Sequence, residues 1–300
     1  MPTSLPGPGS GMTLRFSEVH PLFGALVDGT TLNRLEEDAA FEEIRRGLDR
    51  FAVLVFRNQP MTGVEQVAFA KRLDGELHTV TTLSVLADGR SASSALTEIS
   101  NVGDQGRILQ GDDRRRVSSL GNRLWHTDAS FRDPAGRYSM LSAKVVPPIE
   151  ANTEFADMRA AYDSLGEETR LEIASLRVHH SVVYSRGLLG FDFTEDERAR
   201  LPGAEHPLVR TIPGSGRRSL YVASHASHIV GLPVPEGRLM LMDLMEHATQ
   251  KRFVYSHAWL PDDFVIWDNR ATMHRAQPFD DKRFARELRR TTTLDLPATH

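Results

Sequence analysis

Apolar residues recur with helical spacing in three stretches of the chain. The first spans residues 39–51, where Phe41, Ile44 and Leu48 fall on one stripe. In the second, Thr62 is placed to cap a helix that continues to Leu73. The third spans residues 236–251 and is predicted to direct three apolar side chains inward, namely Leu239, Met242 and Met245.

Short apolar or alternating runs predict strands, which dominate the second half of the chain. The expected strands are residues 52–56, 138–146, 177–184, 219–222, 253–259, 264–268 and 287–294. Many short strands with few helices favour a mainly β fold with flanking helices, either a β-sandwich or a jelly roll, the double-stranded β-helix.

One long polar stretch, residues 84–119, interrupts these elements. Loops of this length in a compact domain are usually functional or disordered, so we expect an excursion from the main fold. Within it, the charged run at residues 112–116 is predicted to be solvated.

Composition and charge exclude several classes of protein. The chain has no cysteine, so disulfides, thiolate metal sites and a cysteine nucleophile are excluded. A net charge of −4 does not favour nucleic acid or anionic membranes as partners. Residues 1–12 lack the basic region and apolar core of a signal peptide, and we expect them to be flexible. A cytoplasmic location is predicted, with residues 13–300 forming one domain.

The segment Trp125-His126-Thr127-Asp128 is the first candidate for chemistry. On an extended backbone, positions i and i+2 face the same way, so His126 and Asp128 can reach one metal ion. A single His-x-Asp is also what chance would place in a chain with 12 histidines. A surface histidine beside a helix-capping aspartate is the alternative.

A second segment offers another potential ligand. The apolar run at residues 264–268 ends in polar residues, and His274 follows shortly afterwards. Two histidines with one carboxylate form the facial set of non-haem iron oxygenases, which leaves coordination positions open. Zinc accepts the same ligands, so the ligand types alone do not identify the metal.

Two arginines follow at a spacing that is typical of one strand face. On a strand, Arg286 and Arg290 share a face with Leu288, while Glu287 and Arg289 point away. Inward guanidinium groups require anionic partners, and their planar fork suits carboxylates. The pair therefore indicates two carboxylate ligands, with a solvated basic run as the alternative.

Taken in order, these motifs resemble the taurine dioxygenase / 2,4-dichlorophenoxyacetate dioxygenase family of 2-oxoglutarate-dependent oxygenases, and within it the aryloxyalkanoate dioxygenases. The resemblance rests on residues 125–128, Thr153, residues 267–270 with His274, and Arg286 with Arg290. Supporting stretches are residues 53–60, 137–143, 155–163, 225–228 and 287–295. The likeness extends over roughly residues 20–296.

The resemblance implies a role for each matched residue. The metal, Fe(II), would be bound by His126, Asp128 and His274, with O₂ and 2-oxoglutarate as co-substrates. The distal carboxylate of 2-oxoglutarate would be held by Thr153 and Arg286. The anionic group of the substrate would be held by Arg290, and two further candidates for the substrate pocket are Asn101 and His228.

Two positions depart from the family pattern. Residues 150–153 read Glu-Ala-Asn-Thr where the family often has Gly-Gly-x-Thr, so the turn changes while the threonine stays. Ile212 follows Arg210-Thr211 where relatives commonly have histidine. The second departure predicts the loss of one polar contact in the substrate pocket.

The implied activity is oxidation of an aryloxyalkanoate such as 2,4-dichlorophenoxyacetate. Its ether would be cleaved to a phenol and glyoxylate, while 2-oxoglutarate yields succinate and CO₂. The expected partners are a small anionic aromatic substrate and further copies of the chain in a homo-oligomer, without nucleic acid or membrane. The alternatives are the same chemistry on a sulfonate, an alkyl sulfate or a phenoxypropionate, or a non-catalytic or zinc-dependent β-barrel binding protein.

Overall fold

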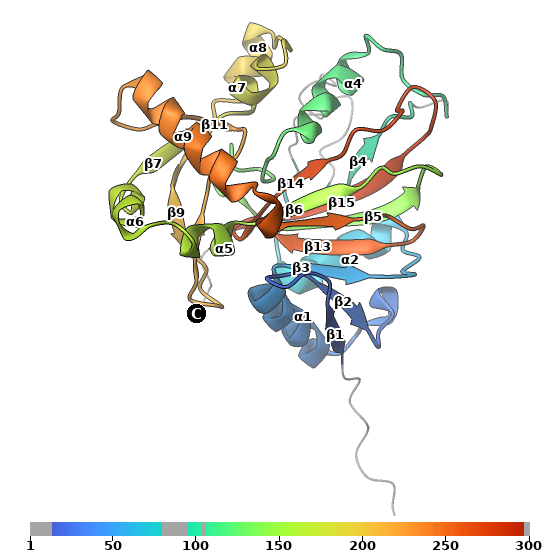
Figure 1. Ribbon diagram of the computed structural model, residues 1–300. Coiled ribbons are helices and arrows are strands. Elements are labelled where there is room, and N and C mark those ends of the chain that lie inside the picture. The colour runs from blue at the N-terminus through green and yellow to red at the C-terminus, as the bar shows by residue number, and fades with distance from the viewer. Residues whose placement is uncertain (1–13, 80–94, 104–105, 297–300) are drawn as a thin grey trace, which may run out of the picture.

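A large β-sheet with helices on its outer face runs through the molecule (Figure 1). The computed structural model describes residues 14–79, 95–103 and 106–296, so the expected flexible segment 1–12 and residues 84–94 of the polar stretch lie outside the described residues. The sheet has the strand order β1-β2-β3-β13-β5-β15-β4. Its strands are β1 (Arg15–Glu18), β2 (Ala25–Asp28), β3 (Val53–Phe56), β4 (Thr97–Ser100), β5 (Gly136–Val145), β13 (Phe264–Asp268) and β15 (Glu287–Leu294).

Three smaller sheets complete the strand arrangement. One has the order β12-β6-β14, another β11-β7-β8, and β9 pairs with β10. Their strands are β6 (Thr153–Asp157), β7 (Arg177–His180), β8 (Ala204–Pro207), β9 (Val209–Thr211), β10 (Arg218–Leu220), β11 (Ala226–Ile229), β12 (Val254–His257) and β14 (Thr272–Ala276).

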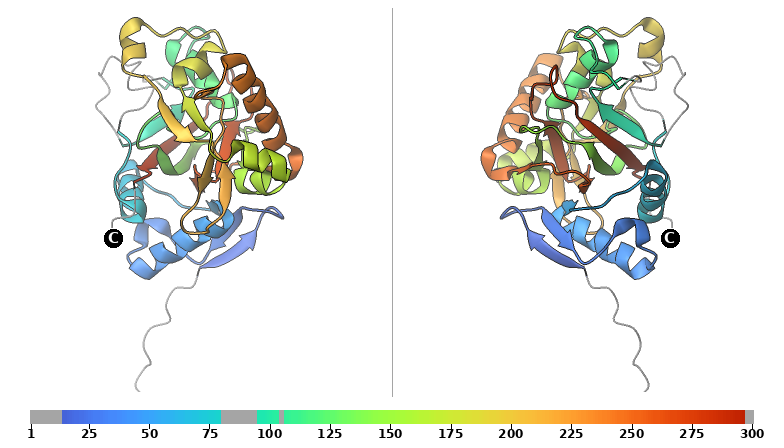
Figure 2. Two further views of the ribbon diagram at one scale, coloured as in Figure 1. Left: turned by 90° about the vertical axis from the view of Figure 1, so that its left-hand side faces the viewer. Right: turned by 90° about the vertical axis from the view of Figure 1, so that its right-hand side faces the viewer.

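Helices cover the outside of these sheets, and the side views place α1 and α9 at well-separated parts of the molecule (Figure 2). The α-helices are α1 (Asp38–Phe51), α2 (Gly63–Asp74), α4 (Arg114–Ser119), α5 (Met158–Asp163), α6 (Glu167–Ile173), α7 (Val182–Gly187), α8 (Glu195–Ala199) and α9 (Val234–Ala248). The 3₁₀ helices are η1 (Leu32–Arg34), η2 (Leu120–Arg123) and η3 (Lys251–Phe253).

The continuous apolar run of β3 shows how the core is divided. Alternate side chains of a strand point to opposite faces. Val53 and Val55 pack in a cluster with Phe155 of β6, between the large sheet and the β12-β6-β14 sheet. Leu54 and Phe56 pack in a second cluster with residues of α1 and α2. Two facing sheets with helices outside confirm the predicted jelly roll.

The first two predicted helices are confirmed. In α1, Phe41, Ile44 and Leu48 are buried on one face, as their spacing requires. Thr62 begins α2 with a capping box, in which its hydroxyl accepts from the Glu65 backbone and the Glu65 carboxylate accepts from the Thr62 backbone.

The predicted inward face of the third helix is wrong at Leu239 and Met242, whereas Met245 packs against the core as predicted. In α9, Leu239 and Met242 are 61% and 65% exposed, and the helix instead buries Leu241 and Leu244 in the cluster against β7 and β11. Apolar residues occupy more than one side of this helix, so its sequence alone does not select the buried face.

Two predictions of local structure also need correction. The expected strand at residues 177–184 ends at His180, because the Ser181 hydroxyl accepts a hydrogen bond from the Tyr184 backbone and begins α7. The charged run at residues 112–116 is exposed at Asp112, Arg114 and Arg115, as predicted, but it begins helix α4 and is not a loop. Asp113 caps α4, Arg114 pairs with Glu197 at 2.9 Å, and Arg116 pairs with Asp281 at 3.0 Å. Glu197 and Asp281 lie far from this run in sequence, so the run alone did not reveal these ion pairs.

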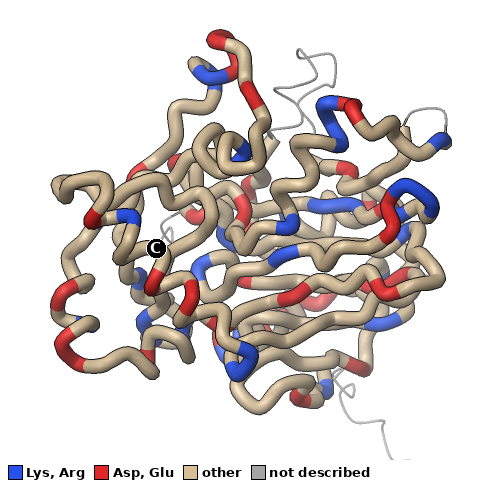
Figure 3. The backbone as a smooth tube through the Cα atoms, turned by 45° about the horizontal axis from the view of Figure 1, so that its top comes forward, with Lys and Arg blue, Asp and Glu red and all other residues tan. Residues whose placement is uncertain are grey.

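Charged residues of both signs are interspersed along the rest of the chain (Figure 3). Among the described residues, the helices lack the combination of length and apolarity that is needed to cross a membrane.

Candidate active site

Three potential metal ligands meet between the large sheet and the β12-β6-β14 sheet. His126, Asp128 and His274 each offer one ligand atom, and these atoms all lie within 4.8 Å of one another. The two histidines also exchange backbone hydrogen bonds, with N···O distances of 2.9 and 2.8 Å. Because His126 is extended, Asp128 returns to the same side two residues later.

The protonation states of these side chains suit a metal ion. Burial lowers the pKa of the His126 imidazole to about 4, and burial places the pKa of His274 well below its usual value. Burial raises the pKa of Asp128, but the charge of Arg290, the two neighbouring histidines and the Ser139 hydrogen bond together outweigh burial and lower this pKa to about 2. At neutral pH, two neutral imidazoles therefore face an ionised carboxylate, which is the state that metal binding requires.

Hydrogen bonds orient the ligands. His126 Nδ1 lies 2.8 Å from the Leu124 carbonyl oxygen, so it carries the proton and leaves Nε2 available. His274 Nε2 lies 3.7 Å from an Asp128 carboxylate oxygen. The Ser139 hydroxyl donates to that same oxygen, Asp128 Oδ2, at 2.8 Å.

Asn269 joins the ligand segment to the end of β13. Its Oδ1 accepts from the Asp128 backbone N–H and from the Trp267 indole N–H, both at 3.0 Å. Its amide nitrogen donates to Ser139 at 2.9 Å. The Asn269 side chain thus positions Asp128 directly through its oxygen and indirectly through Ser139.

Arg286 and Thr153 form a second polar cluster beside the ligands. Arg286 is 7% exposed, and its Nη2 donates to the Thr153 hydroxyl at 3.3 Å. The Trp259 indole N–H also donates to this hydroxyl, at 3.0 Å. Burial lowers the pKa of Arg286 to about 10, which keeps it charged at neutral pH. No carboxylate among the described residues pairs with it, so this cavity contains a buried cation suited to an anionic ligand.

Arg290 occupies the other end of this strand face. It forms an ion pair with Asp128 Oδ1, and it lines one cavity together with Arg286 and Leu288, as the predicted alternation requires. Arg289 points away and pairs with Glu287 at 3.1 Å.

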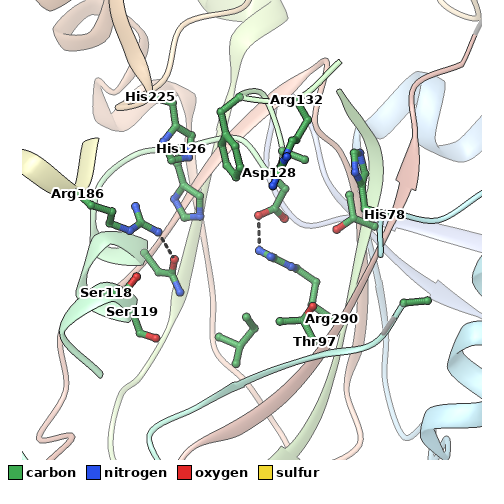
Figure 4. Close-up of a pocket in the computed structure, with 16 residues that line it drawn as sticks. His78, Thr97, Ser118, Ser119, His126, Asp128, Arg132, Arg186, His225 and Arg290 are labelled. Carbon is green, nitrogen blue, oxygen red and sulfur yellow. Dashed lines mark hydrogen bonds and ion pairs between the residues drawn. The ribbon is translucent and has the colours of Figure 1, made fainter. Parts of the chain in front are cut away.

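A larger cavity, which Arg286 does not line, opens beside His126 and Asp128 (Figure 4). Three arginines line it, namely Arg132, Arg186 and Arg290. Its apolar surface includes Ile99, Ala129 and Phe131, and further lining residues include His78, Ser118, Ser119, Asn122 and His225. A ring-bearing anion matches this combination of charge and apolar surface.

Two residues predicted for the substrate pocket lie elsewhere. The His228 ring stacks on His179 with centroids 5.0 Å apart and does not line the large cavity. Asn101 lines a neighbouring cavity, where its Oδ1 accepts from the Arg286 backbone at 2.8 Å and its amide nitrogen donates to the carbonyl oxygens of Asp281 and Phe284. The third expectation, a lost pocket contact at Ile212, is also not met, because Ile212 packs against Ala52 and Ala271 away from the cavity.

Sequence reasoning missed several residues of the site. His225 lies three residues before His228 and lines the cavity from the turn that precedes β11. Arg186 lies just beyond the segment expected to be a strand, residues 177–184, and no motif marked it. Asn269 lies inside the Trp267–Arg270 motif, which is the one signal that could have identified it.

The arrangement of donors can hold a divalent metal and expose it to two ligands. Two histidines and one carboxylate are the donor set of mononuclear iron oxygenases and leave positions open. His274 Nδ1 is buried without a hydrogen-bond partner among the described residues. One adjoining cavity contains a buried cation, Arg286, and the other has a basic, partly aromatic lining.

Comparisons with known proteins agree with this geometry. The model of the "Taurine catabolism dioxygenase TauD, TfdA family" matches residues 15–292. The chain is 46% identical over 288 residues to the alpha-ketoglutarate-dependent 2,4-dichlorophenoxyacetate dioxygenase of Cupriavidus pinatubonensis, covering 95% of this chain and 99% of the relative. It is 34% identical to the (S)-phenoxypropionate/alpha-ketoglutarate-dioxygenase of Sphingobium herbicidovorans, covering 86% and 87% of the two chains.

A solved structure is similar over nearly its whole length. The structure of AAD-2 in complex with Mn(II) and N-oxalylglycine superposes with a TM-score of 0.91 at 42% identity, covering 96% of this chain and all of that chain.

Proposed function

Because the chain belongs to the TauD/TfdA family of dioxygenases, we propose that it oxidises an aryloxyalkanoate, cleaving the ether bond to release a phenol and glyoxylate. It is an Fe(II)- and 2-oxoglutarate-dependent enzyme. We assign this activity to one domain of residues 13–300, and a cytoplasmic location and a homo-oligomeric state stay predictions.

One observation carries the choice of substrate class. The larger cavity adjoins the metal ligands, and its described lining offers three arginines but only one carboxylate, Asp128. That carboxylate is a metal ligand and is paired with Arg290. The excess positive charge requires an anionic ligand, and Phe131 and Ile99 provide apolar surface for a ring.

Each group of residues has a separate role in the proposed reaction. Iron(II), 2-oxoglutarate and O₂ supply the oxidising chemistry, in which one oxygen atom enters succinate and the other enters the substrate C–H bond beside the ether oxygen. Metal binding falls to His126, Asp128 and His274. Arg286 and Thr153 hold the distal carboxylate of 2-oxoglutarate by charge and by hydrogen bonding.

The reaction then depends on how the substrate is held. Arg290 holds the substrate's anionic group and so directs the reacting carbon toward the metal. Oxidation at that carbon produces a hemiacetal, whose collapse transfers a proton to the phenolic oxygen and releases glyoxylate.

A substrate panel tests the proposal. Succinate and the organic product would be measured with Fe(II) and 2-oxoglutarate for 2,4-dichlorophenoxyacetate, a 2-phenoxypropionate, taurine and an alkyl sulfate. We expect phenol and succinate in equal amounts, and the highest kcat/KM, with the aryloxyacetate. If taurine or the alkyl sulfate gave a higher ratio of organic product to succinate than the aryloxyacetate, that compound class would become the proposed substrate class. An anaerobic titration with Fe(II) and 2-oxoglutarate distinguishes a zinc-dependent binding protein, since only the iron chelate gives a visible absorption band.

Replacing Arg290 by glutamine should weaken substrate binding and uncouple the reaction. Loss of a charge-assisted pair in a partly desolvated site costs about 1.5–3 kcal/mol, or roughly 10- to 150-fold in affinity. The phenol-to-succinate ratio should fall, because the C–H bond is no longer held in place. Arg290→Lys should recover only part of the effect, since it keeps the charge but not the planar fork. Iron content is the control, because Arg290 also pairs with Asp128. Equal ratios and equal substrate affinities in all three proteins would exclude Arg290 as the anchor.

A further inference from the structure

Arg186, on α7, is a buried cation that the reaction described above does not use. Its residue exposure is 6%, and it lines the larger cavity. Its Nη2 donates to Asn122 Oδ1 at 3.2 Å, whereas Nε and Nη1 are buried without a partner among the described residues. No described carboxylate pairs with it, so two N–H directions remain for a ligand.

The backbone beneath Arg186 is shaped to receive its guanidinium group. A Cβ atom at Gly121 would lie 2.2 Å from both Cζ and Nη1 of Arg186. The glycine therefore allows the guanidinium to lie against η2, where any side chain would displace it. Ser118, Ser119 and Asn122 line the same wall, so the polar side chains near Arg186 on this wall are neutral.

The charges around the cavity indicate the kind of ligand that Arg186 binds. Arg186 and Arg290 point into the cavity from opposite sides of His126 and Asp128 (Figure 4). Asp128 is the only carboxylate among the described lining residues, and its Oδ1 pairs with Arg290 while the residue is also a metal ligand. Burial, together with the charge of Arg290, lowers the pKa of Arg186 to about 10, so Arg186 stays charged at neutral pH. An anion between them would remove the cost of two facing, incompletely paired cations.

Arg132 is the third arginine of this cavity, and its surroundings differ. It is half-buried, its Nη1 faces the Arg200 carbonyl oxygen at 3.5 Å, and its guanidinium lies 5.8 Å from the Phe131 ring centroid. Its Nε and Nη2 are, like two nitrogens of Arg186, buried without a partner among the described residues. Arg186 is the more deeply buried of the two and has a glycine that makes room for it. Of these two arginines, Arg186 is therefore the stronger candidate for binding an anionic ligand.

We propose that Arg186 is a second substrate anchor, which binds the carboxylate of the aryloxyalkanoate from the wall opposite Arg290. This inference rests on the proposed function and deepens it. The carboxylate receives donors from two sides, and the aryl ring extends over Ile99, Ala129 and Phe131. Two anchors on opposite walls restrict rotation of the short chain that links carboxylate and ring, so they select for the acid and orient its reacting carbon.

Binding without turnover tests the proposal directly. Protein loaded with Mn(II) and N-oxalylglycine would be titrated calorimetrically with 2,4-dichlorophenoxyacetate and with its neutral amide. The proteins are wild type, Arg186→Gln, Arg186→Lys and Gly121→Ala, with Arg46→Gln on the exposed surface of α1 as the matched control for loss of one charge. Comparison of acid with amide isolates the contribution of the carboxylate.

Arg186→Gln should weaken binding of the acid by about 10- to 150-fold and binding of the amide by less than about 3-fold. Arg186→Lys should recover part of the loss. Gly121→Ala should weaken the acid selectively, because its methyl group displaces the guanidinium while residue 186 remains arginine. N-oxalylglycine affinity should stay within about 3-fold of wild type throughout and reports an intact fold.

Two outcomes would overturn the proposal, and they are distinguishable. Wild-type affinity for the acid in both Arg186→Gln and Gly121→Ala would exclude Arg186 as an anchor and leave the proposed function standing. Wild-type protein that binds N-oxalylglycine but neither the acid nor the amide would refute the substrate class and the anchor together. If Arg186→Gln fails to fold, the affinity of Gly121→Ala for the acid relative to the amide decides whether Arg186 is an anchor.

Discussion

Alanine at His126, Asp128 or His274 is expected to lower 2-oxoglutarate turnover by more than about 100-fold, since loss of even an outer partner of a metal ligand typically costs 10- to 100-fold. Each substitution removes one of three protein donors from a site that has no described substitute. The measurements are succinate formation and the iron retained after gel filtration. Circular dichroism would establish that the fold is intact.

Ser139→Ala is the matched control for this prediction. Its hydroxyl donates to Asp128 Oδ2 at 2.8 Å but offers no ligand of its own. We expect weaker iron binding, by roughly 10- to 100-fold, with turnover restored at high Fe(II) concentration. Near-normal turnover with iron bound in any of the three alanine variants would remove that residue from the ligand set.

Replacing Arg286 by methionine is expected to weaken 2-oxoglutarate binding by about two to four orders of magnitude. Breaking a buried charge pair by removing one partner costs about 3–5 kcal/mol, and 1.4 kcal/mol corresponds to a factor of ten. Arg286 should have a larger effect than Arg290, because it is more deeply buried and has no other acidic partner among the described residues. The dissociation constant would be measured anaerobically from the absorption of the iron chelate.

The same substitution should leave the unliganded protein equally stable or more stable. Without 2-oxoglutarate, Arg286 is a buried cation whose side chain contacts the Thr153 hydroxyl and the wall of the cavity. Its removal eliminates a desolvation cost, so the free energy of unfolding in urea should not fall. Arg286→Lys provides the control, with charge retained and the fork lost. Unchanged 2-oxoglutarate affinity in Arg286→Met would show that the co-substrate binds elsewhere.

Local pattern predicted well those elements whose apolar residues form one continuous run or one stripe. The strands at residues 264–268 and 287–294 have those bounds in the structure, and both lie within the large sheet. Helix α1 was predictable because its apolar residues form one stripe. In α9 the apolar residues lie on several sides, and the choice of buried face depends on the β7 and β11 strands that it meets.

The sequence by itself determined the chemical types of the site and their local geometry. An extended backbone brings His126 and Asp128 to one side, and strand alternation brings Arg286 and Arg290 to one face, because both depend only on positions two or four residues apart. The polar end of the apolar run at residues 264–268 pointed to His274 as the third ligand, and the motif resemblance added Thr153 to the same site.

Only the tertiary structure decided what each group meets across the cavity. It pairs Arg290 with Asp128, uses Asn269 to hold the Asp128 backbone, and brings His225 rather than His228 to the cavity. It also lays Arg186 over Gly121, 65 residues away by number. These contacts join segments that are remote along the chain, so their geometry follows from sheet register and packing, and no local pattern of residues encodes it.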